Sequence, residues 1–188
     1  MHRCFIRPEN ISGNQVVLDA EESHHLLRVL RVKLDEPVIG FDGKGTEYQL
    51  TITSLKPRAL EAKITSTRVS EAESPVTLIL AQALVKGDKM EFILQKAVEL
   101  GVSEIVPLIT QHVAFHLDPG KYAAKQERWR ATILEACKQC GRAILPQVKE
   151  IIPFSEWLTY LADKPAMNLL CYEKAGRSIR SLLQAEPA

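Results

Sequence analysis

The sequence has 188 residues, of which 46% are hydrophobic and 25% are charged, a composition typical of a globular protein. No run approaches the roughly 20 apolar residues that cross a membrane, and no apolar stretch of signal-peptide length follows Met1. We therefore expect a soluble cytoplasmic protein whose four cysteines are reduced. Since the net charge is only +1, any nucleic-acid site must depend on local clusters of Lys and Arg.

The first 70 residues predict a small β-rich module. Short β-like runs are separated by turn signals such as DGKG at residues 42–45 and KPR at residues 56–58. One helix, over residues 21–32, interrupts them. Short strands at this spacing are typical of a small barrel or sandwich, so residues 1–70 are assigned to one module. The polar segment 69–75 is predicted to be a linker.

Residues 75–188 predict an α/β domain. The nearly continuous apolar run TLILAQALV at residues 77–85 is typical of a parallel strand buried on both faces. An amphipathic helix over 88–100 ends at Gly101, and a strand at 105–109 precedes a long helix over 121–142. Further strands are expected at 146–152 and 167–172, and helices at 155–161, with Ser155 as its cap, and at 176–184. This alternation predicts a parallel sheet covered by helices.

The first polar group lies in SHHLLRVLR. At about 100° per residue, His24, Arg28 and Arg31 share roughly 60° of a helix surface, opposite the leucines, and His25 lies at the margin. Such a face suits phosphate or base-edge contacts. From the spacing alone, a solvated face on a packed helix is the stronger alternative.

The second group surrounds the start of helix 88–100. Lys86 follows the buried strand at its carboxyl end, where open α/β sheets bind ligands. Asp88 and Glu91 have the spacing of a capping box, and Glu91 and Gln95 lie on the polar side of the helix. A capped surface helix explains these residues equally well, and the Lys-Gly pair is not a Walker loop.

The third group follows one side of helix 121–142, where Arg128, Glu135, Gln139 and Arg142 fall within roughly 80° of one another. This helix carries six Lys or Arg residues against two Glu, a basic patch that the net charge conceals. Such a row could contact a nucleotide, pair with a partner subunit, or be a solvated face.

The CKQC motif is interpreted as packing. Cys137 and Cys140 lie near the end of that helix on its apolar side, whereas a redox pair needs a helix N-terminus. A zinc site needs four ligands, and only Cys4 and Cys171 remain, without paired spacing. We expect no metal.

Several of these segments occur together in a known family. In order, they are ESHHLLRVLRVK, FDGKGTEY, AQALVKGDKMEFILQKAVELGV, IVPL, and RW followed by EACKQCGR. Through nearly the whole chain, the sequence resembles the 16S ribosomal RNA (uridine-N3)-methyltransferases of the RsmE type. The resemblance implies an N-terminal PUA-like β-barrel for RNA binding and a SPOUT-type catalytic domain whose C-terminal trefoil knot holds S-adenosylmethionine. It also implies a homodimer, with each active site near the subunit interface, and 3-methyluridine in small-subunit ribosomal RNA as the product.

The sequence departs from the family pattern in two places. Residues 110–112 read Thr-Gln-His where the family usually has an Arg. The family's glycine-rich G-P-E-G-G loop and its later L-x-R-x-E-T segment, which build the knot and cofactor pocket, have no counterpart. We therefore expect most of the cofactor pocket to lie outside this chain, and the chain alone to show little cofactor binding and no methyl transfer.

Site residues follow from these groups and from the resemblance. Methylating uridine N3 requires the base to leave any pair and to lose its N3 proton, so positioning and electrostatics are expected to dominate. The residues expected to bind RNA are Arg3, His24, His25, Arg28, Arg31 and Lys86. The residues expected to line the catalytic cleft or dimer face are Glu91, Gln95, Arg128, Glu135, Gln139 and Arg142, with the general base unassigned.

Two other functions remain open. A non-catalytic RNA-binding or ribosome-assembly protein needs no knot and explains the basic helical faces. A small-molecule α/β enzyme that binds a phosphate at Lys86 leaves the β-rich module and the HHLLRVLR face unexplained.

Overall fold

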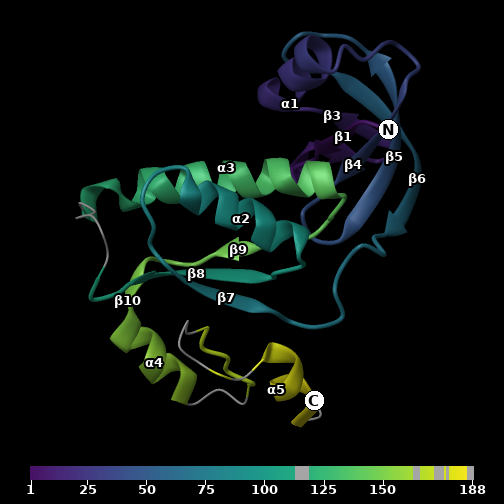
Figure 1. The fold of residues 1–188 in the computed structure, drawn as a ribbon. Coiled ribbons are helices and arrows are strands. Elements are labelled where there is room, and N and C mark those ends of the chain that lie inside the picture. Colours follow the sequence, from purple (N-terminus) through teal and green to yellow (C-terminus); the bar gives the residue numbers. More distant parts are fainter. Residues whose placement is uncertain (113–118, 163–165, 172–175, 177, 186–188) are drawn as a thin grey trace.

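The computed structural model describes residues 1–112, 119–162, 166–171, 176 and 178–185. It contains two sheets, each with its own helices (Figure 1). Strands β1 to β6 form the first sheet and strands β7 to β10 the second, so the two modules follow one another along the chain.

The N-terminal sheet has six strands in the order β1-β4-β5-β6-β3-β2. They are β1 (Arg3–Phe5), β2 (Ile11–Ser12), β3 (Gln15–Val17), β4 (Pro37–Phe41), β5 (Thr46–Ser54) and β6 (Glu61–Val69). Only β1 and β4 pair in parallel, and the other neighbours are antiparallel. A short 3-10 turn, η1 (Pro8–Asn10), connects β1 to β2. The alternating side chains of these strands fill one apolar core that includes Ile6, Val38, Leu50 and Ile52.

The predicted helix over 21–32 is shorter and changes type. Helix α1 (Ala20–His24) begins after Asp19, whose carboxylate accepts the N–H of Glu22 at 2.9 Å. It continues as one wide π-helical turn, η2 (His25–Val29). Leu26 of this turn is fully buried in the module's core. Arg31 has a φ of 56°, so the chain has left the helix there, and the prediction that it continues to residue 32 was wrong.

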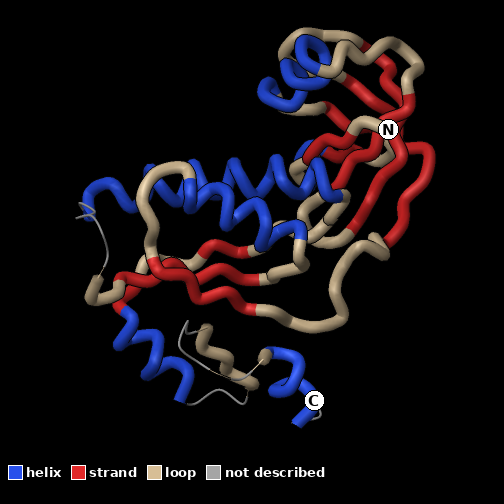
Figure 2. Tube along the Cα trace, in the orientation of Figure 1, coloured by secondary structure: helices blue, strands red, loops and turns tan. Residues whose placement is uncertain are grey.

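The second sheet is parallel, in the order β10-β8-β7, with β9 also pairing with β8. Its strands are β7 (Ile79–Ala83), β8 (Glu104–Ile109), β9 (Gln147–Val148) and β10 (Ile152–Pro153). Its helices are α2 (Lys89–Glu99), α3 (Tyr122–Cys140), α4 (Phe154–Ala162) and α5 (Ile179–Ala185), with a 3-10 turn η3 (Pro119–Lys121) before α3. Helices α2 and α3 cover one face, and α4 lies on the other (Figure 2). This is the α/β architecture that the sequence predicts.

Each face of this sheet has its own apolar cluster. Beneath α2 and α3, Leu94, Trp129 and Ile133 pack against Ile105. On the opposite face, Trp157 of α4 packs with Val106 and Leu108. Strand β8 is therefore buried on both faces and is the central strand of the described sheet.

Strand β7 differs from its prediction. Among the strands that the structure describes, it pairs only with β8 and so lies at the edge of the described sheet, and none of its five residues is buried. An apolar run cannot distinguish a central from an edge strand, because that depends on which strands pair beside it.

Several boundaries also differ from the predictions. Helix α3 ends at Cys140 because Gly141 takes a φ of 88°, so Arg142 lies outside the helix. The expected strand over 146–152 is two short strands, and α4 begins at Phe154, which places Ser155 inside the helix rather than at its cap. Residues 167–171 form no strand in the described part of the chain, and residue 172 lies outside it.

The capping box is another difference. The Asp88 side chain makes no capping hydrogen bond, and the Glu91 carboxylate is paired with Arg128 of α3 instead. The ion pair between two helices replaces the local cap.

A hydrogen-bonded seam joins the two modules. The N–H of Gly45 donates to the carbonyl of Ala143 at 3.1 Å, and the N–H of Leu145 donates to the carbonyl of Gly43 at 3.0 Å. Gly43 has a φ of 74°, and a Cβ there would lie 2.9 Å from the Leu145 side chain. Only glycine satisfies both the backbone conformation and this close approach.

The segment predicted as a linker belongs to the same seam. Glu73 accepts hydrogen bonds from the guanidinium of Arg142 at 2.9 and 3.0 Å and from the N–H groups of Ala143 and Ile144, both at 2.9 Å. The segment predicted as a linker is therefore held in place, because the Glu73 carboxylate accepts hydrogen bonds from donors just after the end of α3.

Candidate nucleic-acid interface

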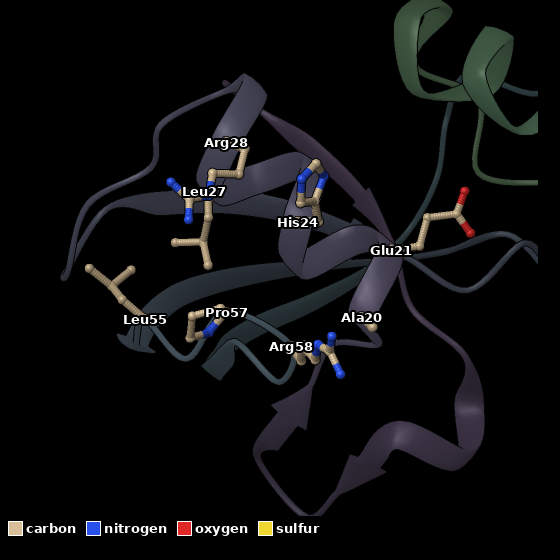
Figure 3. A pocket seen from close by; sticks show the side chains of 8 residues that line it. All are labelled: Ala20, Glu21, His24, Leu27, Arg28, Leu55, Pro57 and Arg58. Atoms are coloured by element: carbon tan, nitrogen blue, oxygen red, sulfur yellow. The ribbon is translucent and has the colours of Figure 1, made fainter.

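A pocket lies between the α1–η2 helix and the loop that joins β5 to β6. We call it the helix–loop pocket. Its volume is about 650 Å³. It is lined by Ala20, Glu21, His24, Leu27, Arg28, Leu55, Pro57 and Arg58 (Figure 3).

Hydrogen bonds through Ser23 fix the two walls of this pocket relative to each other. The buried Ser23 hydroxyl donates to the carbonyl of Leu18 at 3.2 Å and accepts the N–H of Leu60 at 2.9 Å. The N–H of Leu18 also donates to the carbonyl of Leu60 at 2.9 Å. The helix is therefore attached to Leu60, the last residue of the loop, which holds Pro57 and Arg58 opposite His24.

The pocket has a cationic rim. Arg28 and Arg58 are exposed, and neither forms a hydrogen bond or ion pair with another described residue. The carboxylate of Glu21 is directed away from the other labelled side chains (Figure 3). The guanidinium donors of both arginines are thus available to an anion.

The structure brings together only part of the first predicted group. His24 and Arg28 line the helix–loop pocket, whereas Arg31 lies beyond the helix, exposed, with its positive φ. His25 is half-buried and does not line the pocket. Sequence reasoning missed Arg58, although its KPR segment was recognised as a turn; helical periodicity cannot detect a cation that reaches a helix from a neighbouring loop.

Arg3, expected as a weaker RNA contact, lies in the seam between the modules. Its guanidinium donates to Glu47 at 2.7 Å and to the carbonyl of Arg142 at 3.2 Å, and stands 5.2 Å from the centre of the Phe41 ring. Burial favours the neutral form of Glu47, but hydrogen bonds from Arg3 and Arg68 outweigh it and lower the Glu47 pKa below its ordinary value of 4.5. Arg3 therefore holds the modules together.

The third predicted group does not form one polar face. Arg128 extends from α3 to α2, where its guanidinium meets both carboxylate oxygens of Glu91, at 2.6 and 2.9 Å. Gln139 is exposed. Arg142, beyond the end of the helix, is buried with only 6% of its side chain exposed, and it also donates to the carbonyls of Val98 and Val102.

Glu135 belongs to a second buried connection between the modules. Lys138 of α3 contacts the carboxylate of Glu22 in α1, and it donates to Glu135 at 2.8 Å. Burial is the largest influence on Glu22 and raises its pKa, although Lys138 opposes the rise. Burial favours the neutral amine of Lys138, but Glu22 and Glu135 outweigh this effect and raise its pKa above 10.5. Lys138 thus remains protonated at the centre of the contact.

The second predicted group remains on the surface. Lys86 is exposed beside Gly87, whose φ is 65°, in the loop after β7. Gln95 donates to Glu99 at 3.1 Å on the outer side of α2. Lys86 and Gln95 do not line the helix–loop pocket.

The structure confirms the packing interpretation of the CKQC motif for Cys137 but not for Cys140, which is exposed at the end of α3. Cys4 and Cys137 are buried, and burial raises the pKa of the Cys137 thiol to about 12. Among the described residues, no group of three or more His, Cys, Asp or Glu side chains is placed to hold a metal ion. No helix in the described part of the chain is long and apolar enough to span a membrane.

Comparison with known proteins identifies both modules. Residues 18–65 match the model of an RNA methyltransferase PUA domain, and residues 72–187, more than half of the chain, match that of an RNA methyltransferase domain. The curated ribosomal RNA small subunit methyltransferase E of Buchnera aphidicola is 28% identical over 82% of this chain. The chain spans between 54% and 61% of the length of four such curated relatives.

Solved structures show the same similarity. A Neisseria gonorrhoeae ribosomal RNA small subunit methyltransferase E, solved with S-adenosyl methionine, is 37% identical, with a TM-score of 0.78 over 88% of this chain and 67% of that one. A Legionella pneumophila protein described as a methyltransferase, solved with the same cofactor, gives a TM-score of 0.86 at 30% identity, over 96% of this chain and 74% of that one. The chain therefore belongs to the RNA methyltransferase family whose members are named ribosomal RNA small subunit methyltransferase E, and it carries that family's PUA domain.

Proposed function

We propose that the protein carrying this chain methylates N3 of a uridine in 16S ribosomal RNA, with S-adenosylmethionine as methyl donor. Residues 1–70 bind the RNA, and residues 75–188 belong to the catalytic domain. The observation that carries the proposal is the rigid attachment of a PUA module with a cationic pocket to an RNA methyltransferase domain, through Arg3, Lys138 and Arg142.

This attachment bears on catalysis because methyl transfer to a base depends on placement. The target uridine must be unpaired, and its N3 must lose a proton and face the methyl group. A module that holds RNA at a fixed distance from the catalytic sheet supplies that placement. The Lys138–Glu22 pair fixes α3 to the first module, and the Arg142–Glu73 pair fixes the turn after α3 to the segment that joins the modules; the side chains of both cations are buried.

The described residues do not by themselves fit the cofactor. Ligands of open α/β sheets bind beyond the carboxyl ends of the strands, where this chain presents Leu84 and Lys86 after β7 and Thr110 after β8. Neither the helix–loop pocket nor the second described cavity, of about 360 Å³, is lined by these residues. The side-chain amide of Gln82 at this edge donates to the carbonyl of Ala83 rather than outward. We therefore derive no catalytic step through the cofactor.

The predicted cleft residues contribute positioning in this proposal. Arg128 and Glu91 connect α2 to α3, and both helices cover the catalytic sheet. Glu91 is paired with Arg128, and Glu135 is paired with Lys138, so neither carboxylate is a free general base. A homodimer with its interface beside α2 and α3 remains part of the proposal.

The test combines two assays on the 188-residue chain and on the full product of its gene. Methylation of small ribosomal subunits with tritiated S-adenosylmethionine, followed by nucleoside mass spectrometry, should yield 3-methyluridine with the full product. Filter binding of 16S ribosomal RNA should weaken as salt rises. RNA binding without any methylation by the full product would favour the alternative, a non-catalytic RNA-binding or ribosome-assembly protein.

A further inference from the structure

We propose that the helix–loop pocket holds one unstacked nucleotide of single-stranded RNA. The proposal rests on the proposed function and specifies how its RNA is recognised. The phosphates on either side of this nucleotide meet Arg28 and Arg58, and its base and ribose lie on the apolar surface between them.

The distribution of charge singles out this pocket. Residues 1–70 contain six arginines. Arg3, Arg7 and Arg68 are paired with carboxylates. The other three form no ion pair with a described residue, and two of those, Arg28 and Arg58, line the same pocket. Unpaired guanidinium groups in one concave site provide the fork of donors that a phosphate accepts.

The apolar lining argues for a nucleotide rather than a phosphate alone. Leu27, Leu55 and Pro57 give the pocket an apolar lining; in the view of Figure 3, Leu27 and Pro57 lie between the guanidinium groups of Arg28 and Arg58, and Leu55 lies to one side of them. The Leu55 residue is 42% exposed, so a base that packs against it removes apolar surface from water. In a duplex the base faces are already stacked, so only an unpaired nucleotide can offer one to this surface.

The volume of the helix–loop pocket agrees with one bound nucleotide. The volume of about 650 Å³ lies within the range of roughly 300–1,000 Å³ typical of small-molecule sites. The wall that carries Pro57 and Arg58 is attached to the helix through Ser23, so the pocket is largely preformed. His24, at the helix end of the pocket, adds ring nitrogens that can bond a ribose hydroxyl or a phosphate oxygen.

The test measures binding of fluorescein-labelled RNA to the 188-residue chain by anisotropy. The probes are a ten-nucleotide oligouridine, a blunt duplex of the same length, and an abasic oligomer with the same number of phosphates. Arg58→Ala is compared with Lys63→Ala, which removes the same charge from an exposed position on β6 outside the pocket. Because Arg58 is also exposed, its replacement should leave the circular dichroism spectrum unchanged.

We expect the oligouridine to bind at least fivefold more tightly than either other probe. Arg58→Ala should weaken its binding roughly tenfold and reduce the salt slope by about 0.7. Lys63→Ala should change the affinity for the oligouridine less than twofold. Leu55→Asn should narrow the difference between the oligouridine and the abasic oligomer, because it removes the apolar contact to the base.

If Arg58→Ala and Lys63→Ala weakened oligouridine binding equally, the attraction would depend on overall charge alone, and the proposal would be overturned. Equal affinity for the abasic oligomer or the duplex would overturn it as well. These measurements need no methyl donor, so they are separate from the proposed activity. If the full gene product methylates RNA but the 188-residue chain shows no preference for the oligouridine, the pocket proposal fails and the proposed activity stands. If the chain prefers the oligouridine but the full gene product methylates no RNA, the proposed activity fails and the pocket proposal stands.

Discussion

Replacing Lys138 by Met tests the buried ion pair that joins the two modules. Met is one atom shorter than Lys and keeps most of its apolar packing, while it removes the charge and the hydrogen bonds of the ammonium group. The side chains of Lys138 and Glu22 are 6% and 4% exposed, so the cost is that of a buried pair rather than of a surface one, which contributes about 0–1 kcal/mol. Leaving one buried charge without its partner costs about 3–5 kcal/mol, and we expect Lys138→Met to lose this much at pH 8.

The pH dependence follows from Glu22. Its pKa is already raised by burial, and loss of Lys138 removes the main influence that lowers it, so the pKa rises further. The folded variant then binds a proton more tightly than the unfolded chain does. Glu22 therefore contributes stability that is fully present below its ordinary pKa of 4.5 and is lost as the pH rises through the raised value. The deficit relative to the wild type should be larger at pH 8 than at pH 5.

Urea unfolding followed by circular dichroism measures this deficit, and a double-mutant cycle isolates the pair. Glu22→Gln combined with Lys138→Met should recover most of the loss, because no buried charge remains without a partner. The reasoning is refuted if Lys138→Met costs less than about 1 kcal/mol at pH 8, or if the double variant is no more stable than Lys138→Met alone.

Two further predictions concern α3 and the turn that ends it. Arg142→Ala should lower the free energy of unfolding by at least about 3 kcal/mol, because it removes the guanidinium from the Glu73 carboxylate and from the carbonyl of Val102. Gln139→Ala on the exposed face should change the free energy of unfolding by less than about 0.5 kcal/mol. Thermal unfolding distinguishes the two variants, and similarly small shifts in both would contradict the buried role of Arg142. At pH 8 a disulfide reagent should react quickly with the exposed Cys140 and only after denaturation with Cys137, whose pKa burial raises to about 12; fast modification of Cys137, located by peptide mass spectrometry, would show that this helix end opens.

The sequence predicts the two modules and the order of most of their elements, because these depend on local periodicity and turn residues. It also predicts His24 and Arg28 as neighbours on one helix face, and both line the helix–loop pocket. It could not identify Arg58, since a loop's position against a helix is set by the hydrogen bonds of Ser23, a long-range contact.

The positions of Arg3 and Arg142 have a common physical cause. Arg142 was placed on a helix face by periodicity and Arg3 was expected to contact RNA, yet each satisfies backbone carbonyls or buried carboxylates at the junction of the modules. Gly141 ends α3 and turns Arg142 inward, which a uniform helical projection cannot show. Local pattern does not report which surfaces a second module will cover.

Photo-crosslinking tests the central claim, that RNA binds to the N-terminal module, most directly. Small-subunit ribosomal RNA containing 4-thiouridine is irradiated with the protein, and the crosslinked peptides are mapped by mass spectrometry. The account predicts crosslinks in residues 20–28 and 55–58, reduced in Arg58→Ala. Crosslinks that are confined to other surfaces, and unchanged by Arg58→Ala, would contradict it.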